Sequence, residues 1–314
     1  MPGPVLSTVT RRSGANAALL DGTVPVEGAT LAQVEVPVLV DGFRRMVRGL
    51  EFDVCELALT TYVVAKAHGA PFTAIPVFLV RGFHHEAIVR AAGGDLTHPK
   101  DLHGRRVGVS RGYTVTTGVW ARGVLAAEHG VDLDQVTWVL TGDEHVAAFR
   151  PPGNVVAASA GADLAAMVTS GELAAAVGVT ADRPGLVPLL DAPRAAGYAA
   201  LRERGHYPIN HLVVVRDDVL AAHPGLAPAL FAAFAESKRR YVDALRAGQG
   251  GSTQTAQMHR TVMEITGRDP LPYGIEPNLP VLHELLDHAL AQHVIDTRPD
   301  PAALFTADTR DLTA

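Results

Sequence analysis

The sequence predicts a mixed α/β protein built as two lobes, from three observations. Short apolar runs alternate with helix-like patterns, as at 106–109, 116–129 and 136–140, which is typical of βαβ units. The length of 314 residues and a hydrophobic content of 47% allow two domains with sizeable cores. Polar, ionisable residues stand at the mouths of two apolar strands, near 81–86 and near 207–211. We interpret each of these two segments as a crossing, where the chain passes from one lobe to the other. Together they predict a site in a cleft between the lobes.

Composition excludes several classes of protein. The formal net charge is −6 and basic residues form no run, so neither nucleic acid nor an anionic membrane surface is an expected partner. The single cysteine, Cys55, cannot form an internal disulfide and lies in an apolar run, where a packed thiol is the favoured interpretation. The N-terminus lacks a secretory pattern and no run of 18 apolar residues occurs. We therefore expect a soluble, cytoplasmic protein.

The first 70 residues predict strands followed by helices. We expect a strand up to Leu20, a turn at 21–22, strands at 24–26 and 34–40, and a helix over 43–50. The segment 52–62, FDVCELALTTY, begins as a strand and becomes helical near Leu57. Thr60 and Thr61 then stand early in that helix, where they either bind an anion or cap the helix.

The segment 76–90, PVFLVRGFHHEAIVR, is the first crossing. Two apolar runs flank a polar group that contains Arg81, His84 and His85. Buried ionisable groups are costly unless paired, so a strand that delivers them into a cleft is one interpretation. An exposed loop between two strands is the other.

The middle of the chain predicts an anion-binding turn. The strand 106–109 is followed by a glycine-containing turn, 110–114, and by the helix 116–129. Such a turn offers backbone amides to an anion, so Arg111 and Thr114 are candidate substrate ligands, with a solvated turn as the alternative. The spacing matches neither GxGxxG nor GxxxxGK[ST], so a nucleotide is not indicated.

The last third contains the second crossing and a helical tail. His211 stands at the start of the apolar strand 212–215, and amphipathic helices are expected at 224–246, 256–266 and 279–294. Before the last helix, the Pro- and Gly-rich loop 267–278 presents Tyr273 and Glu276.

These residues support a family resemblance. Six segments resemble the 4,5-dihydroxyphthalate decarboxylase family: FDVCELALTTY (52–62), PVFLVRGFHHEAI (76–88), DLHGRRVGV (101–109), GVWARG (118–123), YPINH (207–211) and PYGIEPN (272–278). The resemblance implies a type 2 periplasmic-binding-protein-like fold with a ligand cleft between its lobes. It also implies a cytoplasmic lyase of aromatic compound catabolism. His84 departs from the family pattern, which has Arg there, so an acid with one fewer carboxylate would suit this chain.

The implied activity is a cofactor-independent decarboxylation of a hydroxylated, phthalate- or benzoate-like acid. The ring carbon is protonated first, and CO2 leaves as aromaticity returns, which needs a general acid and cations for carboxylates. We expect His85 as the proton donor, with His211 and Glu56 as its catalytic partners. The expected substrate ligands are Arg81, Thr60, Thr61, Arg111, Thr114, Tyr273 and Glu276. No metal is expected, because no HxH or HExxH spacing occurs, although two His and a carboxylate leave a divalent ion open.

The predicted lobes are residues 1–96 with 207–314, and the inserted residues 97–206. Two other functions stay open: a non-catalytic carboxylate-binding protein of the same fold, and a lyase or dehydratase of the menaquinone-pathway type. The expected partner is a small aromatic acid, and a homo-oligomer is left open.

Overall fold

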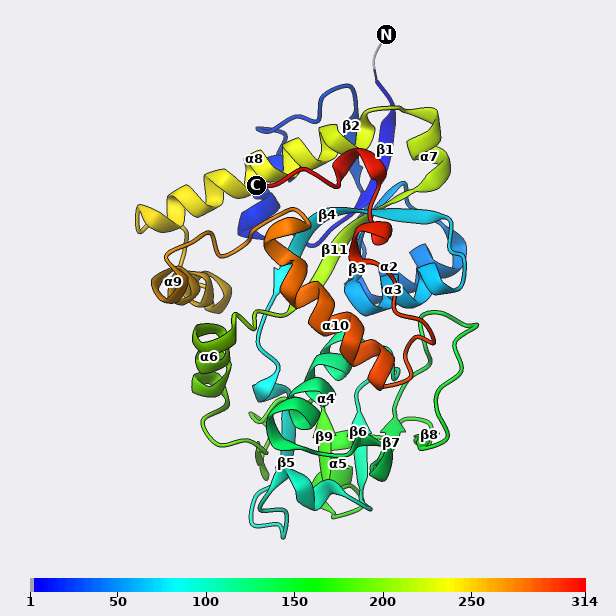
Figure 1. Ribbon diagram of the computed structural model, residues 1–314, viewed down its shortest axis with the longest axis vertical. Coiled ribbons are helices and arrows are strands. Elements are labelled where there is room, and N and C mark those ends of the chain that lie inside the picture. Colours follow the sequence, from blue (N-terminus) through cyan, green and yellow to red (C-terminus); the bar gives the residue numbers. More distant parts are fainter. Residues whose placement is uncertain (1–2) are drawn as a thin grey trace. The chain divides into compact units, whose positions relative to one another are not determined.

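The computed structural model describes residues 3–314, which form two compact units with one sheet each (Figure 1). The first unit contains the chain up to Arg81, Ile209–His283 and Pro299–Ala314. The second contains Gly82–Pro208 and Glu284–Arg298. In these described residues no helix is both long and apolar enough to cross a membrane.

The first unit has a five-stranded sheet in the order β2-β1-β3-β11-β4. Its strands are β1 Val5–Val9, β2 Thr30–Gln33, β3 Val54–Ala58, β4 Phe72–Arg81 and β11 Ile209–Arg216. Strand β1 runs parallel to β2 and β3, whereas β11 is antiparallel to both β3 and β4. All five residues of β3 are buried, as expected for a strand inside the sheet.

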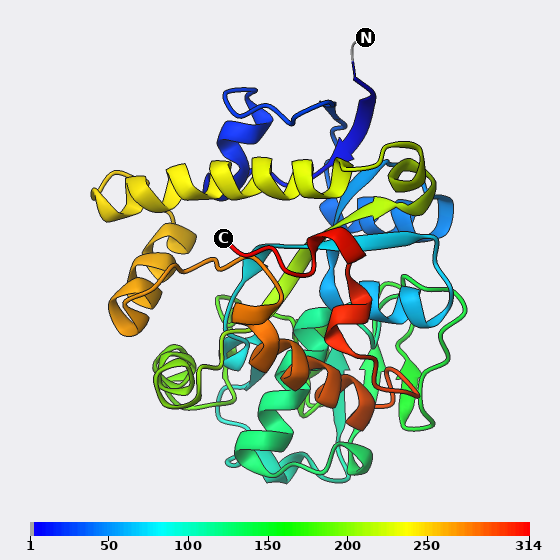
Figure 2. The same ribbon diagram turned by 45° about the horizontal axis from the view of Figure 1, so that its top comes forward.

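Helices complete the first unit. They are η1 Gly14–Asn16, α1 Ala17–Leu20, α2 Leu39–Gly49, α3 Leu59–Ala67, α7 Asp217–Ala222, α8 Leu226–Arg246, α9 Gln254–Thr266, η5 Glu276–Asn278, η6 Pro301–Leu304 and η7 Ala307–Thr309. Figure 2 shows α8 in yellow with η1 and α1, in blue, beside it. Leu230 and Phe234 are fully buried on the apolar side of α8.

Strand β4 lies at one end of the sheet, and its outer side is covered by other segments of the first unit. Ala74 donates its N–H to the Tyr62 hydroxyl, and its carbonyl accepts from Thr306 N at 3.0 Å. Gly274 N donates to the carbonyl of Pro76 at 2.8 Å. Pro76 has no N–H to donate, so an end strand suits it. These contacts pair backbone groups that an uncovered end strand would expose.

The second unit has a six-stranded sheet in the order β10-β5-β9-β6-β7-β8. Its strands are β5 Ile88–Ala91, β6 Arg106–Val109, β7 Thr137–Leu140, β8 Val155–Ala157, β9 Ala175–Val177 and β10 Leu186–Pro188. Its helices are η2 His85–Ala87, η3 Pro99–Leu102, α4 Thr116–His129, η4 Leu133–Gln135, α5 Leu164–Thr169 and α6 Pro193–Arg204. Val89, Val139 and Val168 belong to its apolar core. Helix α10, Leu279–Ala291, begins in the first unit and ends in the second.

Most predicted elements are confirmed, but three at the N-terminus are wrong. The strand expected up to Leu20 ends at Val9, and residues 17–20 are helical. The strand expected over 34–40 lies earlier, at Thr30–Gln33, because Pro37 cannot donate to a ladder and Val38 is 53% exposed. At 24–26 there is a single bridge, from Val26 to Ala29.

The lobe boundaries predicted from the sequence differ from this division of the chain. Strand β5 already lies in the second sheet, so the chain leaves the first unit at Arg81 instead of near residue 96. It returns at Ile209, close to the expected residue 207. Residues 284–298 group with the second unit, because Gln292 and Glu284 bond to residues of that unit.

Candidate functional site

A buried carboxylate and an imidazole form a pair in the sheet of the first unit. Glu56, on β3, is 1% exposed, and its Oε1 lies 2.6 Å from Nδ1 of His211, on β11. Its other oxygen accepts from the backbone N–H of Arg11 at 2.8 Å. The ring of Phe43 lies edge-on to the imidazole, with 5.1 Å between centroids. Nδ1 of His211 is thus engaged, which leaves Nε2 for exchange with a ligand.

An irregular stretch of sheet sets the position of His211. The pairing of β11 with β4 shifts register between Ile209 and His211, and again on both sides of Leu212. Such bulges redirect side chains and are common beside functional sites. The missing N–H of Pro76 contributes, since Val213 pairs with Ile75 whereas Leu212 pairs with Phe78.

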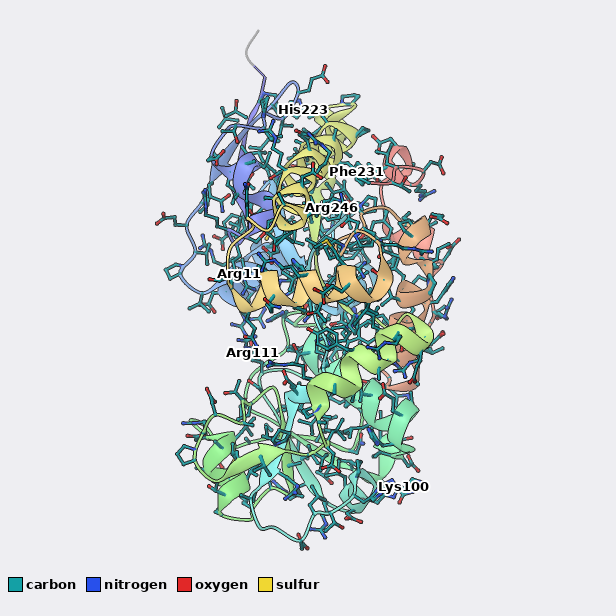
Figure 3. The ribbon with its side chains drawn as sticks, turned by 90° about the vertical axis from the view of Figure 1, so that its left-hand side faces the viewer. Arg11, Lys100, Arg111, His223, Phe231 and Arg246 are labelled. Atoms are coloured by element: carbon teal, nitrogen blue, oxygen red, sulfur yellow. The ribbon has the colours of Figure 1, made fainter. Side chains whose placement is uncertain are left out.

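A pocket of about 510 Å³ lies within the first unit and is lined by Glu56. The other polar and charged side chains on its wall are Arg11, Arg12, Ser13, Arg81, Tyr241, Thr253, Thr255 and His259. Figure 3 shows Arg11 beside the first turn of α9, which agrees with the place of Thr253 and Thr255 on the same wall. Three guanidinium groups around one volume favour an anionic ligand, because Arg binds carboxylates through a planar fork.

Arg81 is held in this wall by the loop that precedes α10. It is 6% exposed and donates a hydrogen bond to Oδ1 of Asn278. The amide of Asn278 in turn donates to the carbonyls of Pro272, at 2.9 Å, and Gly274, at 2.7 Å. The loop therefore orients an arginine that the sequence predicted as a substrate ligand.

Tyr241 and His259 form a second polar pair on the pocket wall. The Tyr241 hydroxyl, on α8, lies 3.0 Å from Nδ1 of His259, on α9. Burial lowers the pKa of His259 to about 4, further helped by Arg81 and opposed by Asp269, so the ring is neutral at pH 7. The tyrosine ring packs against Gly14, where an added Cβ would lie 2.3 Å from a ring carbon. Only glycine fits there.

The second unit contains His85, the proton donor expected from the sequence. Its ring is fully buried, and Nε2 lies 3.0 Å from each oxygen of Glu128, which also accepts from Arg204. His206 forms a similar pair with Glu284 at 2.9 Å. Burial, reinforced by His206 and His85, lowers the pKa of His84 to about 3. These histidines pack against one another and against Trp120.

The predicted anion-binding turn is filled by a side chain of the protein. Glu144 accepts hydrogen bonds from the N–H groups of Tyr113 and Thr114, and from the Thr114 hydroxyl at 2.5 Å. Arg111 is exposed, has φ +74°, and donates its N–H to Thr141. The backbone amides of this turn thus serve an internal carboxylate.

The remaining predicted residues lie in the first unit. Thr60 and Thr61 are fully buried in the first turn of α3, and Glu276 is an exposed residue that opens η5. The Tyr273 hydroxyl is buried and has no hydrogen-bond partner among the described residues. The Tyr273 ring lies 4.9 Å from Nζ of Lys238. The structure therefore brings Glu56, His211 and Arg81 to one region, and it holds His85, Arg111 and Thr114 in the other unit.

Sequence reasoning missed Arg11, Tyr241, His259 and Asn278. The Arg11-Arg12-Ser13-Gly14 turn after an apolar strand was an available signal, because glycine-containing turns often approach ligands closely. Tyr241 and His259 gave none, since each reads as part of an amphipathic helix. Within residues 3–314, no three His, Cys, Asp or Glu side chains group so as to hold a metal ion. Burial raises the pKa of the Cys55 thiol far above its usual value, which agrees with a packed thiol.

The two sheets and their connections define a periplasmic-binding-protein-like α/β fold, as predicted. Among solved structures, the aliphatic sulphonate binding protein SsuA from Escherichia coli has a TM-score of 0.55 at 13% identity, with 99% of both chains covered. The desulfurization enzyme DSZB has a TM-score of 0.56 at 16% identity, with 98% of both chains covered. A binding protein and an enzyme share this fold, so the fold alone does not decide between them.

Sequence relatives are more specific. The NMT1/THI5-like family matches residues 51–239. The 4,5-dihydroxyphthalate decarboxylase of Comamonas testosteroni is 31% identical over 307 residues, which cover 91% of this chain and 92% of the relative. The chain belongs to the 4,5-dihydroxyphthalate decarboxylase family. The predictions of the family and of a carboxy-lyase are confirmed at this level.

Proposed function

We propose that the protein decarboxylates a hydroxylated aromatic acid in the first-unit pocket. The observation that supports this best is that full-length similarity to a decarboxylase coincides with a pocket that has three arginines and the Glu56–His211 pair on or beside its wall. A non-catalytic binding protein would need only the cations, whereas an imidazole that a carboxylate orients beside the pocket can also transfer a proton. This pair therefore favours the enzyme.

The proposed reaction begins with the substrate carboxylate held by Arg81 and Arg11. His211, oriented by its hydrogen bond to Glu56, delivers a proton from Nε2 to the ring carbon that bears the departing carboxylate, so a C–H bond forms. A ring hydroxyl supplies electrons and becomes a protonated carbonyl that keeps its hydrogen, which gives a dienone-like cation. The C–C bond to the carboxylate then breaks, its electron pair restores aromaticity, and CO2 leaves. The overall change consumes one proton and releases one CO2.

The experiment is CO2 release from purified protein with 4,5-dihydroxyphthalate and with hydroxybenzoic acids. CO2 formation in proportion to protein supports the proposal. Ligand binding without CO2 supports a binding protein instead, and loss of water from a ligand would support a dehydratase. Phthalate, which has no ring hydroxyl, is the matched control and should release no CO2, because it cannot form the dienone.

We also propose that no cofactor is required, so dialysis against EDTA should leave the rate unchanged. An EDTA-sensitive rate restored by one divalent metal ion would contradict this. A cytoplasmic location remains a proposal that is supported by the lone cysteine. A homo-oligomer is likewise a proposal. Size-exclusion chromatography with light scattering, which measures the molar mass in solution, would test it.

A further inference from the structure

The Tyr241–His259 pair stands on the pocket wall, and the proposed proton transfer does not use it. Both side chains line the pocket that Glu56, Arg11 and Arg81 also line. His259 is only 4% exposed, and Tyr241 engages its Nδ1 at 3.0 Å. A buried imidazole with one nitrogen engaged in this way is held in orientation and presents its other nitrogen in a set direction.

The helices around the pair hold it rigidly. Thr253 caps α9, since its hydroxyl accepts from Ala256 N at 3.1 Å, and His259 follows in the second turn of that helix. Gly14, the first residue of η1, lets the Tyr241 ring pack closely against this short helix. Side chains on rigid elements place a hydrogen bond more reproducibly than side chains on loops.

The charge of the pair distinguishes it from the rest of the wall. Arg11, Arg12 and Arg81 are cations that suit carboxylates, whereas the His259 ring is neutral at pH 7 because it is buried. A neutral ring nitrogen suits a hydroxyl best, because a hydroxyl can donate to it in one tautomer of the ring and accept from it in the other. A carboxylate can only accept.

We infer that Nε2 of His259, oriented by Tyr241, binds a ring hydroxyl of the substrate and selects hydroxylated aromatic acids over their unsubstituted analogues. This inference rests on the proposed function and adds to it the residue that recognises the hydroxyl. His259 would be a specificity residue in contact with the ligand, and Tyr241 a positioning residue that acts through it.

The test compares the binding of 3,4-dihydroxybenzoate and benzoate by calorimetry. These probes carry the same carboxylate and differ in their ring hydroxyls. The wild-type protein should bind the hydroxylated probe about tenfold more tightly, which is the size of one neutral hydrogen bond. In His259→Asn the shorter amide still reaches Tyr241 but leaves the Nε2 position empty. The tenfold preference should disappear while benzoate affinity stays unchanged.

Three further variants distinguish recognition of the hydroxyl from a general change in the pocket. His259→Gln places an amide near the Nε2 position and should restore part of the preference. Tyr241→Phe keeps the ring but frees Nδ1, and should reduce the preference without changing benzoate affinity. Gln257→Ala changes an exposed residue of α9 that does not line the pocket and should preserve the preference. A merely structural role for His259 would lower affinity for both probes equally.

The outcomes separate this inference from the proposed function. An unchanged preference in folded His259→Asn and Tyr241→Phe overturns the inference, even if the protein releases CO2. A preference that depends on His259 in a protein that releases no CO2 supports the inference and overturns decarboxylation. Failure of both probes to bind wild-type protein contradicts the assignment of the pocket and the inference together.

Discussion

Both units pair imidazole rings with carboxylates, but the pairs stand in different surroundings. In the first unit, Glu56 holds His211 and also lines a pocket whose wall has three arginines. In the second, Glu128 holds His85, whose ring has no exposed surface, and Arg204 reaches the same carboxylate. The first arrangement leaves polar atoms for a ligand, and the second matches ion pairs that stabilise a folded unit.

The largest expected effect is on turnover and separates the two pairs directly. His211→Asn should lower kcat by about 10²–10⁴-fold, or about 3–5 kcal/mol in the barrier, because asparagine cannot donate a proton at neutral pH. The matched change His85→Asn should destabilise the fold by about 1–3 kcal/mol, through a lost buried hydrogen bond, and leave kcat within a few-fold. Steady-state kinetics and urea unfolding of both variants measure this.

The sequence-based prediction of His85 as the proton donor implies the opposite result, a large loss of kcat in His85→Asn. Collapse of kcat in stable His85→Asn protein, with turnover retained in His211→Asn, would favour that prediction and contradict the comparison.

The next effect is on substrate binding. Arg81→Ala should weaken binding by about 1.5–3 kcal/mol, the range for a hydrogen bond to a charged group. Arg81→Lys should recover part of this, because an ammonium group lacks the planar fork. Arg246→Ala is the control, since that arginine is an exposed residue of α8 paired with Asp243 (Figure 3). Equal Kd values for wild type and Arg81→Ala would remove Arg81 from the site.

A smaller effect concerns stability in acid, and it tests the structural role of the second unit. Burial raises the pKa of Glu128, but hydrogen bonds from His85 and Arg204 outweigh it and lower the pKa to about 2. For Glu284, likewise, burial raises the pKa, and hydrogen bonds from His206 and His288 lower it to about 2. A carboxylate whose folded pKa is depressed stabilises the fold above its unfolded value, near 4.5, and this stability is lost as pH falls towards 2.

Urea unfolding at pH 5 and pH 3 measures that loss. Glu128→Gln should reduce the loss between these values by about 1–2 kcal/mol, a figure discounted for partial exposure of the carboxylate. Identical pH dependence in the variant and the wild type would mean that the Glu128 pair does not contribute to folding.

The smallest effect is expected for Tyr273. Its buried hydroxyl has no hydrogen-bond partner among residues 3–314, so Tyr273→Phe should change stability by less than about 0.5 kcal/mol and kcat by less than about twofold. A tenfold loss of kcat would instead support the substrate-binding role that the sequence suggested for this tyrosine.

The fold could be predicted from the sequence wherever local pattern and tertiary context agree. The strand 106–109 with its following turn and helix is one example, because hydrophobic period and glycine placement indicate the same element. The strand predicted over residues 34–40 was wrong. Their valines suit a strand, but Pro37 and the exposure of Val38 exclude these residues from the sheet.

The site was harder to predict because its pairs join distant parts of the chain. Glu56 and His211 are 155 residues apart, and both were named, since each interrupts an apolar strand where a charge must find a partner. His85 gives the same signal, yet its partner Glu128 lies on a helix whose pattern shows no sign of it. His259 and Tyr241 suit their helices without conflict, so the sequence gives no reason to single them out.

The covered end strand β4 has a consequence for how the protein tolerates crowding and storage. Residues 72–80, FTAIPVFLV, are apolar except for Thr73, and they would attract strands of other molecules if the backbone were open. The Tyr62 hydroxyl, Gly274 and Thr306 already occupy this edge, and Pro76 interrupts its row of donors. Damage that loosens the segment 299–314, such as proteolytic nicking, should therefore show first as aggregation of chains whose remaining structure is intact.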